Sequence, residues 1–220
     1  MIKVFRLGYA EFATGNPDGM LHYYTEIMGL NVVERAGDGT AYLSIGLDHH
    51  NVVVRPGSES RIAAVGWQLD GKMTLAEVAR ALREHGISSE IRHDARPGIA
   101  ELLEVQDPAG YTLHLYTQMK MPAPGYGKSG IVPLKLGHLA LCAPDARKTV
   151  AFYRDILNFW ETDWLYDRAN FLTCNHDHHT LNIVQSDRSV MHHIAFELRD
   201  ATHHQQAAEF LIKNGIVTGW

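Results

Sequence analysis

The chain is poor in cysteine and has no long hydrophobic run. Its 220 residues include two cysteines, Cys142 and Cys174, which lie far apart and form no Cys-x-x-Cys pair. This argues against a disulfide framework and a cysteine-based zinc site, and we expect both thiols to be reduced and buried. No apolar stretch approaches membrane-spanning length, and the first residues lack the pattern of a signal peptide. These absences predict a cytoplasmic protein with no membrane partner.

An excess of positive charge is also lacking. The 20 Lys and Arg residues are outnumbered by 25 Asp and Glu residues, which gives a formal charge of -5 and a pI near 6.3. Such a chain offers no basic surface to nucleic acid. With 45% hydrophobic and 20% charged residues, the composition is that of a folded globular protein. We therefore expect a small molecule as the partner, and no nucleic acid.

Histidine, in contrast, is abundant near the C-terminus. The chain has 14 histidines, and seven of them fall in one short stretch: His176, His178, His179, His192, His193, His203 and His204. Imidazole serves both as a metal ligand and as an acid or base near neutral pH. This stretch is where we look for the chemistry of the protein.

The sequence also contains an internal repeat. Comparing residue n with residue n+129 gives five matches over some eighty residues: 7–10 with 136–139, Tyr24 with Tyr153, Ile27 with Ile156, His49-His50 with His178-His179, and Gly86-Ile87 with Gly215-Ile216. One match would be chance, but a common offset over this distance predicts a duplicated module.

The Pro/Gly-rich stretch 122–133 separates the two copies, because it can form neither a helix nor a central strand. We place the first module at 1–121 and the second at 134–220. In the first module the patterns predict strands at 4–12, 31–35, 41–45, 51–55 and 64–69, strands near Glu90, Leu102 and Thr112, and helices at 18–28 and 74–85. Asp18 is the expected N-cap of the first helix, and Thr74 and Glu77 form a capping box for the second. Each half-module is thus a βαβββ unit, and the fold class is α+β.

The second module repeats this order with strands at 134–141, near Phe159, Phe171 and Leu181, and at 193–198, and with helices at 145–157 and 202–214. The three strands that would complete its last unit have no counterpart before Trp220. We therefore expect a module that is incomplete at its C-terminus, with an open sheet edge that favours association into a homo-oligomer.

Two histidines occupy equivalent first strands of the third and fourth units. His138 lies in the strand Gly-His-Leu-Ala-Leu, and His193 begins the strand His-Ile-Ala-Phe. The pseudo-symmetry of the units should bring the two rings side by side, which predicts a site for a divalent first-row metal. The alternative for each is a strand histidine that binds a backbone carbonyl. Tyr9 and Trp67, the expected equivalents in the first module, fill space and bind no metal.

Four motifs carry a resemblance to a known family: Gly-His-Leu-Ala-Leu at 137–141, Phe-Tyr-Arg-Asp-Ile-Leu-Asn-Phe at 152–159, the segment 171–181 that ends in His-His-Thr-Leu, and Met-His-His-Ile-Ala-Phe-Glu-Leu at 191–198. Together with the repeat, they resemble the type I extradiol catechol dioxygenases of the vicinal oxygen chelate superfamily. That family has four βαβββ units in two modules, of which the first lacks the metal.

The resemblance implies a role for each histidine of the motifs. His138 and His193 match the two iron ligands, and His179 matches the acid/base histidine. His178, the alternative to His179, and His192 are expected near the substrate, with His192 on the opposite strand face from His193. The third ligand of the family, a glutamate in a Glu-x-Tyr strand, has no match in this sequence. We expect His176, His203 and His204 to be solvated.

The implied reaction is ring cleavage of a catechol by Fe(II) and O₂, with Mn(II) as the alternative metal. Without the glutamate, the 220 residues are expected to bind iron weakly and to be inactive by themselves. Two alternatives remain open: a metal-dependent glyoxalase or epimerase of the same fold, and a metal-free binding protein or inactive remnant. The missing ligand favours the last, and the retained histidines argue against it.

Overall fold

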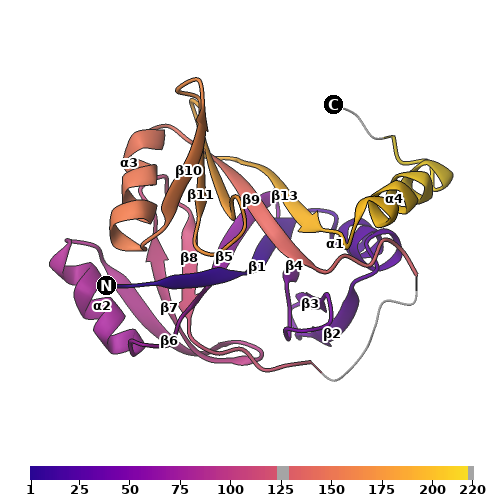
Figure 1. Ribbon diagram of the computed structural model, residues 1–220. Helices are drawn as coiled ribbons and strands as arrows, with labels where there is room; N and C mark the ends of the chain where they lie inside the picture. Colours follow the sequence, from indigo (N-terminus) through magenta and orange to yellow (C-terminus); the bar gives the residue numbers. More distant parts are fainter. Residues whose placement is uncertain (123–128, 218–220) are drawn as a thin grey trace.

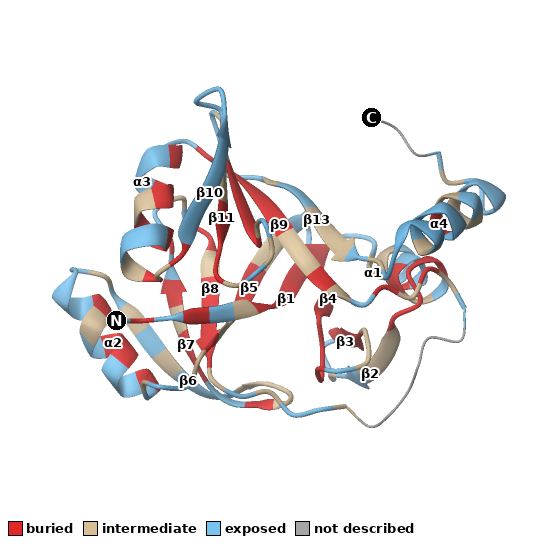
Figure 2. Ribbon diagram, viewed as in Figure 1, coloured by how far each residue is buried: buried red, intermediate tan, exposed pale blue. Residues whose placement is uncertain are grey.

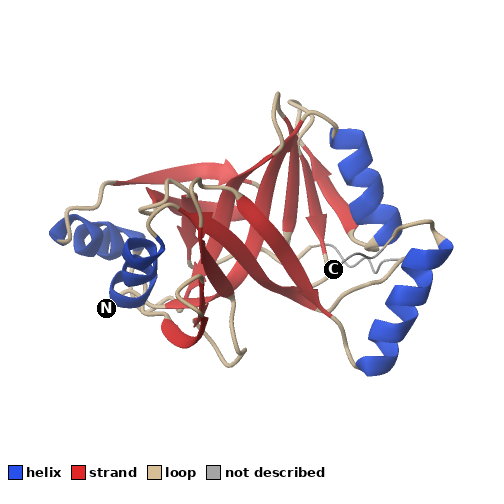
Figure 3. Cartoon of the chain, turned by 90° about the horizontal axis from the view of Figure 1, so that it is seen from above, coloured by secondary structure: helices blue, strands red, loops and turns tan. Residues whose placement is uncertain are grey.

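The computed structural model describes residues 1–122 and 129–217. Part of the predicted linker, 123–128, lies outside the described residues, so the boundary at 122–133 stays a prediction. In the described part of the chain, no helix is long and apolar enough to cross a membrane. Figure 3 shows the helices gathered at two sides of the molecule, with the strands between them.

The N-terminal part forms one curved eight-stranded sheet in the order β2-β3-β4-β1-β5-β8-β7-β6 (Figure 1). Its strands are β1 (Val4–Thr14), β2 (Asn31–Arg35), β3 (Ala41–Ser44), β4 (Val52–Pro56), β5 (Arg61–Leu69), β6 (Ser89–Arg96), β7 (Ile99–Gln106) and β8 (Thr112–Tyr116). The helices are α1 (Pro17–His22), continued by the π-helical segment η1 (Tyr23–Ile27), and α2 (Leu75–Glu84). The predicted βαβββ order of both units is confirmed.

The C-terminal part forms a five-stranded sheet in the order β10-β11-β12-β9-β13. Its strands are β9 (Lys135–Ala143), β10 (Trp160–Leu165), β11 (Ala169–Thr173), β12 (Leu181–Gln185) and β13 (Met191–Glu197). Its helices are α3 (Ala146–Ala151), continued by the π-helical segment η2 (Phe152–Ile156), and α4 (Ala201–Lys213). Within the described residues, β13 pairs only with β9, whereas its counterpart β5 lies between β1 and β8.

The offset of 129 residues relates the two sheets element by element. It superposes α1 on α3, η1 on η2 and β4 on β12 without a shift of either boundary. It also relates two ion pairs: Arg6 binds Asp48 at 2.6 Å, and Lys135 binds Asp177 at 2.9 Å. The duplication predicted from the sequence is therefore present in the fold.

The two N-terminal helix caps differ in how well the sequence predicted them. Thr74 accepts a hydrogen bond from the Glu77 N–H, and the Glu77 carboxylate accepts one from the Thr74 N–H, so the capping box is confirmed. The prediction of Asp18 as a cap is wrong. Asn16 caps α1 by accepting from the Gly19 N–H at 3.0 Å, because Pro17 begins the helix and places the cap before it.

One apolar core extends through both modules, where buried positions lie on strands of both sheets (Figure 2). Trp67 is fully buried and belongs to this core. The Trp67 ring packs edge-on against Phe159 at 5.2 Å and against Tyr153 at 6.4 Å. The equivalence of Trp67 with His193 is therefore wrong. The strand registers pair Glu11 with Ala64 and Ala140 with His193, so Ala64 is the counterpart of His193.

A second buried cluster fills the inner face of the eight-stranded sheet: Tyr9, Tyr42, Val53, Ile99, Leu102 and Tyr116. The Tyr9 hydroxyl is 2.6 Å from His114 Nδ1. Tyr9 is fully buried, as expected for a residue that fills space where the other module carries His138.

Replacing Gly66 with alanine is expected to destabilise the protein by about 1–3 kcal/mol, because the new methyl group would overlap the Tyr9 ring. The ring is buried and hydrogen-bonded, so it cannot move aside at low cost. Denaturant unfolding of the purified variant measures the effect. Gly37→Ala is the matched control, since a methyl group at exposed Gly37 meets nothing within 4 Å. Equal stability of the two variants would contradict the tight packing described for Tyr9.

Candidate metal centre

His138 projects from the inner face of the five-stranded sheet. Its neighbours Leu139 and Leu141 in β9 belong to the apolar core on the other face. Side chains alternate between the two faces of a strand, so His138 points away from that core. This is the face that Tyr9, its counterpart at the offset of 129, occupies in the first module.

His193 meets His138 from the adjacent strand β13. The Nε2 atoms of the two rings are 3.0 Å apart, and the ring planes cross at 80°. The antiparallel register pairs Ala195 with His138 and His193 with Ala140, which places both rings on the same face. The two nitrogens therefore converge on one point, as the symmetry of the units predicts.

His179 completes a group of three rings. It lies in the turn before β12, and its ring centre is 4.2 Å from that of His138. The edge of its ring packs against Phe171 of β11 at 5.0 Å. His178 is exposed, and its Nδ1 lies 3.0 Å from His179 Nδ1. Of the two neighbours, His179 is thus the one that contacts His138.

His192 is not on the opposite strand face from His193, so this prediction is wrong. The Nδ1 atoms of the two rings are 2.7 Å apart. A register shift between Met191 and His193 marks a β-bulge, which places an extra residue in β13 and interrupts the alternation of side chains. The first module has a matching shift between Glu11 and Phe12.

The electrostatic surroundings favour neutral imidazoles. The pKa of His138 is lowered to about 4. Burial is the largest cause, and the nearby His179 and His193 lower the pKa further. Burial also lowers the pKa of His179 and of His193, with His178 and His192 respectively as the next causes. A neutral imidazole keeps the lone pair that a metal requires.

The spacing of the two Nε2 atoms fits neighbouring positions on a metal with six ligands. Metal–nitrogen bonds of about 2.1 Å at about 90° place the two nitrogens about 3.0 Å apart, whereas a tetrahedral angle would give about 3.4 Å. Among residues 1–122 and 129–217, no group of three His, Cys, Asp or Glu side chains is arranged to hold a metal. The acidic Asp177 and Glu197 are bound by Lys135, at 2.9 and 3.0 Å. The described residues therefore offer two candidate ligands, His138 and His193.

The remaining histidines of the stretch lie outside this group. His176 and His204 are exposed, as expected. His203 was expected to be solvated as well, but it is half-buried, with its Nε2 2.6 Å from the Ile131 carbonyl oxygen and its Nδ1 accepting the Arg199 N–H. This correction reflects the packing of α4 against the segment before β9.

Sequence reasoning missed one residue of the inner face. Asn182 in β12 is 5% exposed and is paired in register with Ala140 on one side and Phe171 on the other. The only sequence signal is the repeat, which aligns Asn182 with the apolar Val53.

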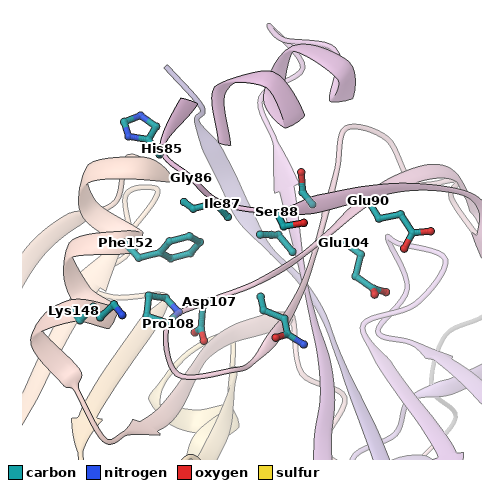
Figure 4. A pocket seen from close by; sticks show the side chains of 13 residues that line it. His85, Gly86, Ile87, Ser88, Glu90, Glu104, Asp107, Pro108, Lys148 and Phe152 are labelled. Carbon is teal, nitrogen blue, oxygen red and sulfur yellow. The ribbon is translucent and has the colours of Figure 1, made fainter. Parts of the chain in front are cut away.

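A separate groove of about 700 Å³ lies where α2, β6 and β7 face α3 (Figure 4). The Phe152 ring points across it toward Ile87, and Lys148 lies at one end, with Pro108 between it and Asp107 in this view. The groove shares no residue with the histidine group. We therefore place the candidate site at the histidines.

Comparison with known proteins shows the family to which the chain belongs. The family model of the Glyoxalase/Bleomycin resistance protein/Dioxygenase superfamily matches residues 6–115 and 135–217. The chain is 29% identical over 208 residues to biphenyl-2,3-diol 1,2-dioxygenase of Pseudomonas sp. (strain KKS102), covering 83% of this chain and 68% of that protein. It is also 29% identical over 220 residues to 2,2',3-trihydroxybiphenyl dioxygenase of Sphingomonas paucimobilis, covering 90% of this chain and 73% of that protein.

Solved structures show the same fold. The Mn(II)-bound glyoxalase from Novosphingobium aromaticivorans superposes with a TM-score of 0.90 at 25% identity, covering 100% of this chain and 74% of that one. The 2,3-dioxygenase LapB from Pseudomonas sp. KL28 gives a TM-score of 0.87 at 22% identity, covering 98% and 82%. Relatives by sequence are thus ring-cleaving dioxygenases, one of which is named an iron-dependent extradiol dioxygenase.

Proposed function

Because the chain belongs to the Glyoxalase/Bleomycin resistance protein/Dioxygenase superfamily, we propose that it is an extradiol dioxygenase that cleaves the ring of a catechol-type aromatic with Fe(II) and O₂. The observation that carries the proposal is the 3.0 Å approach of the His138 and His193 Nε2 atoms on the inner face of the sheet. The region 1–121 would be the module without a metal, and 134–220 the catalytic-type module.

In this proposal His138 and His193 hold the metal through Nε2. When bound, an Fe(II) with open positions would let the two oxygens of a catechol and O₂ coordinate side by side. Mn(II) is the alternative metal, which the likeness to a Mn(II)-bound glyoxalase supports.

His179 is the proposed general base. Its ring lies against that of His138, so it is within reach of a diol held there, and its lowered pKa leaves it neutral and able to accept a proton from a catechol hydroxyl. Phe171 packs against the His179 ring and restricts its orientation. His178 and His192 lie at the rim, each beside one of the proposed site residues, as candidate substrate contacts.

The partners proposed for the protein are a catechol-type substrate, O₂ and further copies of the same chain in a homo-oligomer. Nucleic acid and membranes are not proposed as partners, and the cytoplasm is the proposed location. The homo-oligomer rests on the open edge of the five-stranded sheet at β13, and the other assignments rest on the composition of the chain and on the aromatic diol named for a relative.

A second candidate function is a metal-dependent isomerisation of the glyoxalase type. The TM-score of 0.90 to a Mn(II)-bound glyoxalase favours it. The two functions differ in their need for O₂, because an isomerase consumes none.

Oxygen consumption by the purified protein with Fe(II) and catechol tests the proposal. With a carboxylate ligand to complete the pair His138 and His193, which the described residues do not supply, we expect uptake of O₂ to accompany the appearance of the yellow ring-opened product, and His138→Ala to abolish both. Loss of the product in the variant without loss of the folded state, checked by circular dichroism, assigns the chemistry to the site. If His138→Ala consumes O₂ as fast as the wild type, the dioxygenase assignment is contradicted. Turnover of a glyoxalase substrate without O₂ uptake would also contradict it.

A further inference from the structure

Four residues form a row across the inner face of the five-stranded sheet. The strand registers pair Phe171 with Asn182, Asn182 with Ala140, and Ala140 with His193. Leu181 and Ile183, the neighbours of Asn182 in β12, belong to the apolar core on the other face. The Asn182 side chain therefore points to the face that carries the histidines.

Asn182 is 5% exposed, and its amide makes no hydrogen bond to the described part of the chain. The amide is not among the fully buried unpartnered groups, so it is open to water or to a ligand on the inner face of the sheet. The first module shows that the fold does not need it: Val53 occupies the equivalent position, is fully buried and packs in the cluster with Tyr9 and Tyr42.

The residue between Asn182 and His193 leaves room for a ring. Neighbouring strands are about 4.8 Å apart, so Asn182 and His193 lie about 10 Å apart across β9. Ala140 separates them, where the first module has Glu11, which forms ion pairs with Arg96 at 2.7 Å and with Arg55 at 3.3 Å. A ring held by its diol at His138 and His193 would extend over the methyl group of Ala140 toward the Asn182 amide.

We propose that Asn182 is a specificity-determining residue, which hydrogen-bonds a polar substituent on the side of the catechol ring remote from the diol. The preferred substrates are then catechols with a hydrogen-bonding group at that position, such as a carboxamide, and not catechols with an apolar substituent. The amide suits this role because it can both donate and accept. The inference rests on the proposed function, since the diol must be held at the histidines.

Two ligands of matched size test the inference: 3,4-dihydroxybenzamide and 4-isopropylcatechol. Their dissociation constants are measured by calorimetry on the full chain with Fe(II) under argon. We expect the wild type to bind the amide about 3- to 10-fold more tightly than the isopropyl compound, and Asn182→Val to lose this preference. Asn170→Val is the matched control, because Asn170 precedes Phe171 in β11 and faces the other side of the sheet. It should keep the wild-type preference.

Thermal unfolding separates a binding role from a structural one. Asn182→Val is expected to keep the melting temperature within about 2 °C of the wild type, because the amide makes no hydrogen bond to the described part of the chain. A melting temperature lowered by more than this would show that the amide supports the fold, and would overturn the inference.

Failure of the inference about Asn182 and failure of the proposed function give different binding results. An unchanged preference in Asn182→Val, with both catechols still bound, contradicts the role of Asn182 and leaves the proposed function standing. Absence of binding of either catechol to the wild type contradicts the proposed function, and the inference falls with it.

Discussion

Replacing His179 with alanine is expected to lower ring-opening turnover by about 10²- to 10⁴-fold, the usual range for loss of a general acid or base. The affinity for metal should stay nearly unchanged, because the ligands in this account are His138 and His193. Turnover is measured from the absorbance of the ring-opened product, and metal affinity by titration of the same variant.

His178→Ala is the matched control for this experiment. His178 is the sequence neighbour of His179 and its ring partner at 3.0 Å, but it is exposed and makes no ring contact with His138. We expect at most a small loss of turnover. If His179→Ala loses the metal, His179 is a ligand and the assigned roles are wrong. If His178→Ala loses as much turnover as His179→Ala, the two roles must be exchanged.

The protein is expected to lose stability steeply as the pH falls below 6.5, because of two buried histidines in the first module. Burial is the main cause that lowers the pKa of His50 and of His114 from 6.5 to about 3. His49, His114 and Arg96 add to the shift at His50, and Arg96 and Arg92 add to that at His114. Glu104, 3.4 Å from His114 Nε2, opposes the shift but does not offset burial.

The direction follows from proton binding. A histidine whose pKa is lower in the folded state binds protons more readily when the chain unfolds, so acid favours unfolding. The contribution of the two neutral histidines to the free energy of unfolding is fully present above pH 6.5 and is lost as the pH drops toward 3. Each buried histidine contributes on the order of 4 kcal/mol over that range. This is comparable with the whole stability of an ordinary domain, so we expect unfolding before pH 3 is reached.

Urea unfolding between pH 7 and pH 4 measures this effect. His50→Asn removes one of the two titrating groups, and we expect a smaller drop in stability over this range than in the wild type. The exposed His22→Asn is the control and should keep the wild-type drop. Equal pH dependence in all three proteins would show that the buried histidines do not control acid unfolding.

The sequence was sufficient to predict the features that depend on the repeat. The βαβββ repeat places His138 and His193 in the equivalent first strands of two successive units, β9 and β13, and these two strands pair in the sheet. The approach of the two rings therefore follows from the pattern of the sequence. The resemblance to a known family then gave roles to His138, His179 and His193 that composition and spacing alone do not supply.

The sequence did not predict features that depend on register and burial. The β-bulge at His192 leaves no mark in composition, so the side of the strand that His192 occupies was misjudged. Trp67 was taken as the counterpart of His193 because both lie in the equivalent strand, but the strand pairing makes Ala64 the counterpart. Asn182 was missed because its proposed role depends on its place in the row with Ala140 and His193, which only the strand registers reveal.

The central claim is that His138 and His193 together bind one divalent metal, and titration of Fe(II) into the protein under argon tests it most directly. We expect a single, weak site in the wild type, because the described residues offer two ligands, and a further weakening on the order of 100-fold or more in both His138→Ala and His193→Ala, since loss of even an outer contact costs 10- to 100-fold. His192→Ala removes the ring beside His193, and this variant should bind Fe(II) far more tightly than His138→Ala or His193→Ala. Absence of binding to the wild type, or equal weakening in His192→Ala and His193→Ala, would contradict the claim.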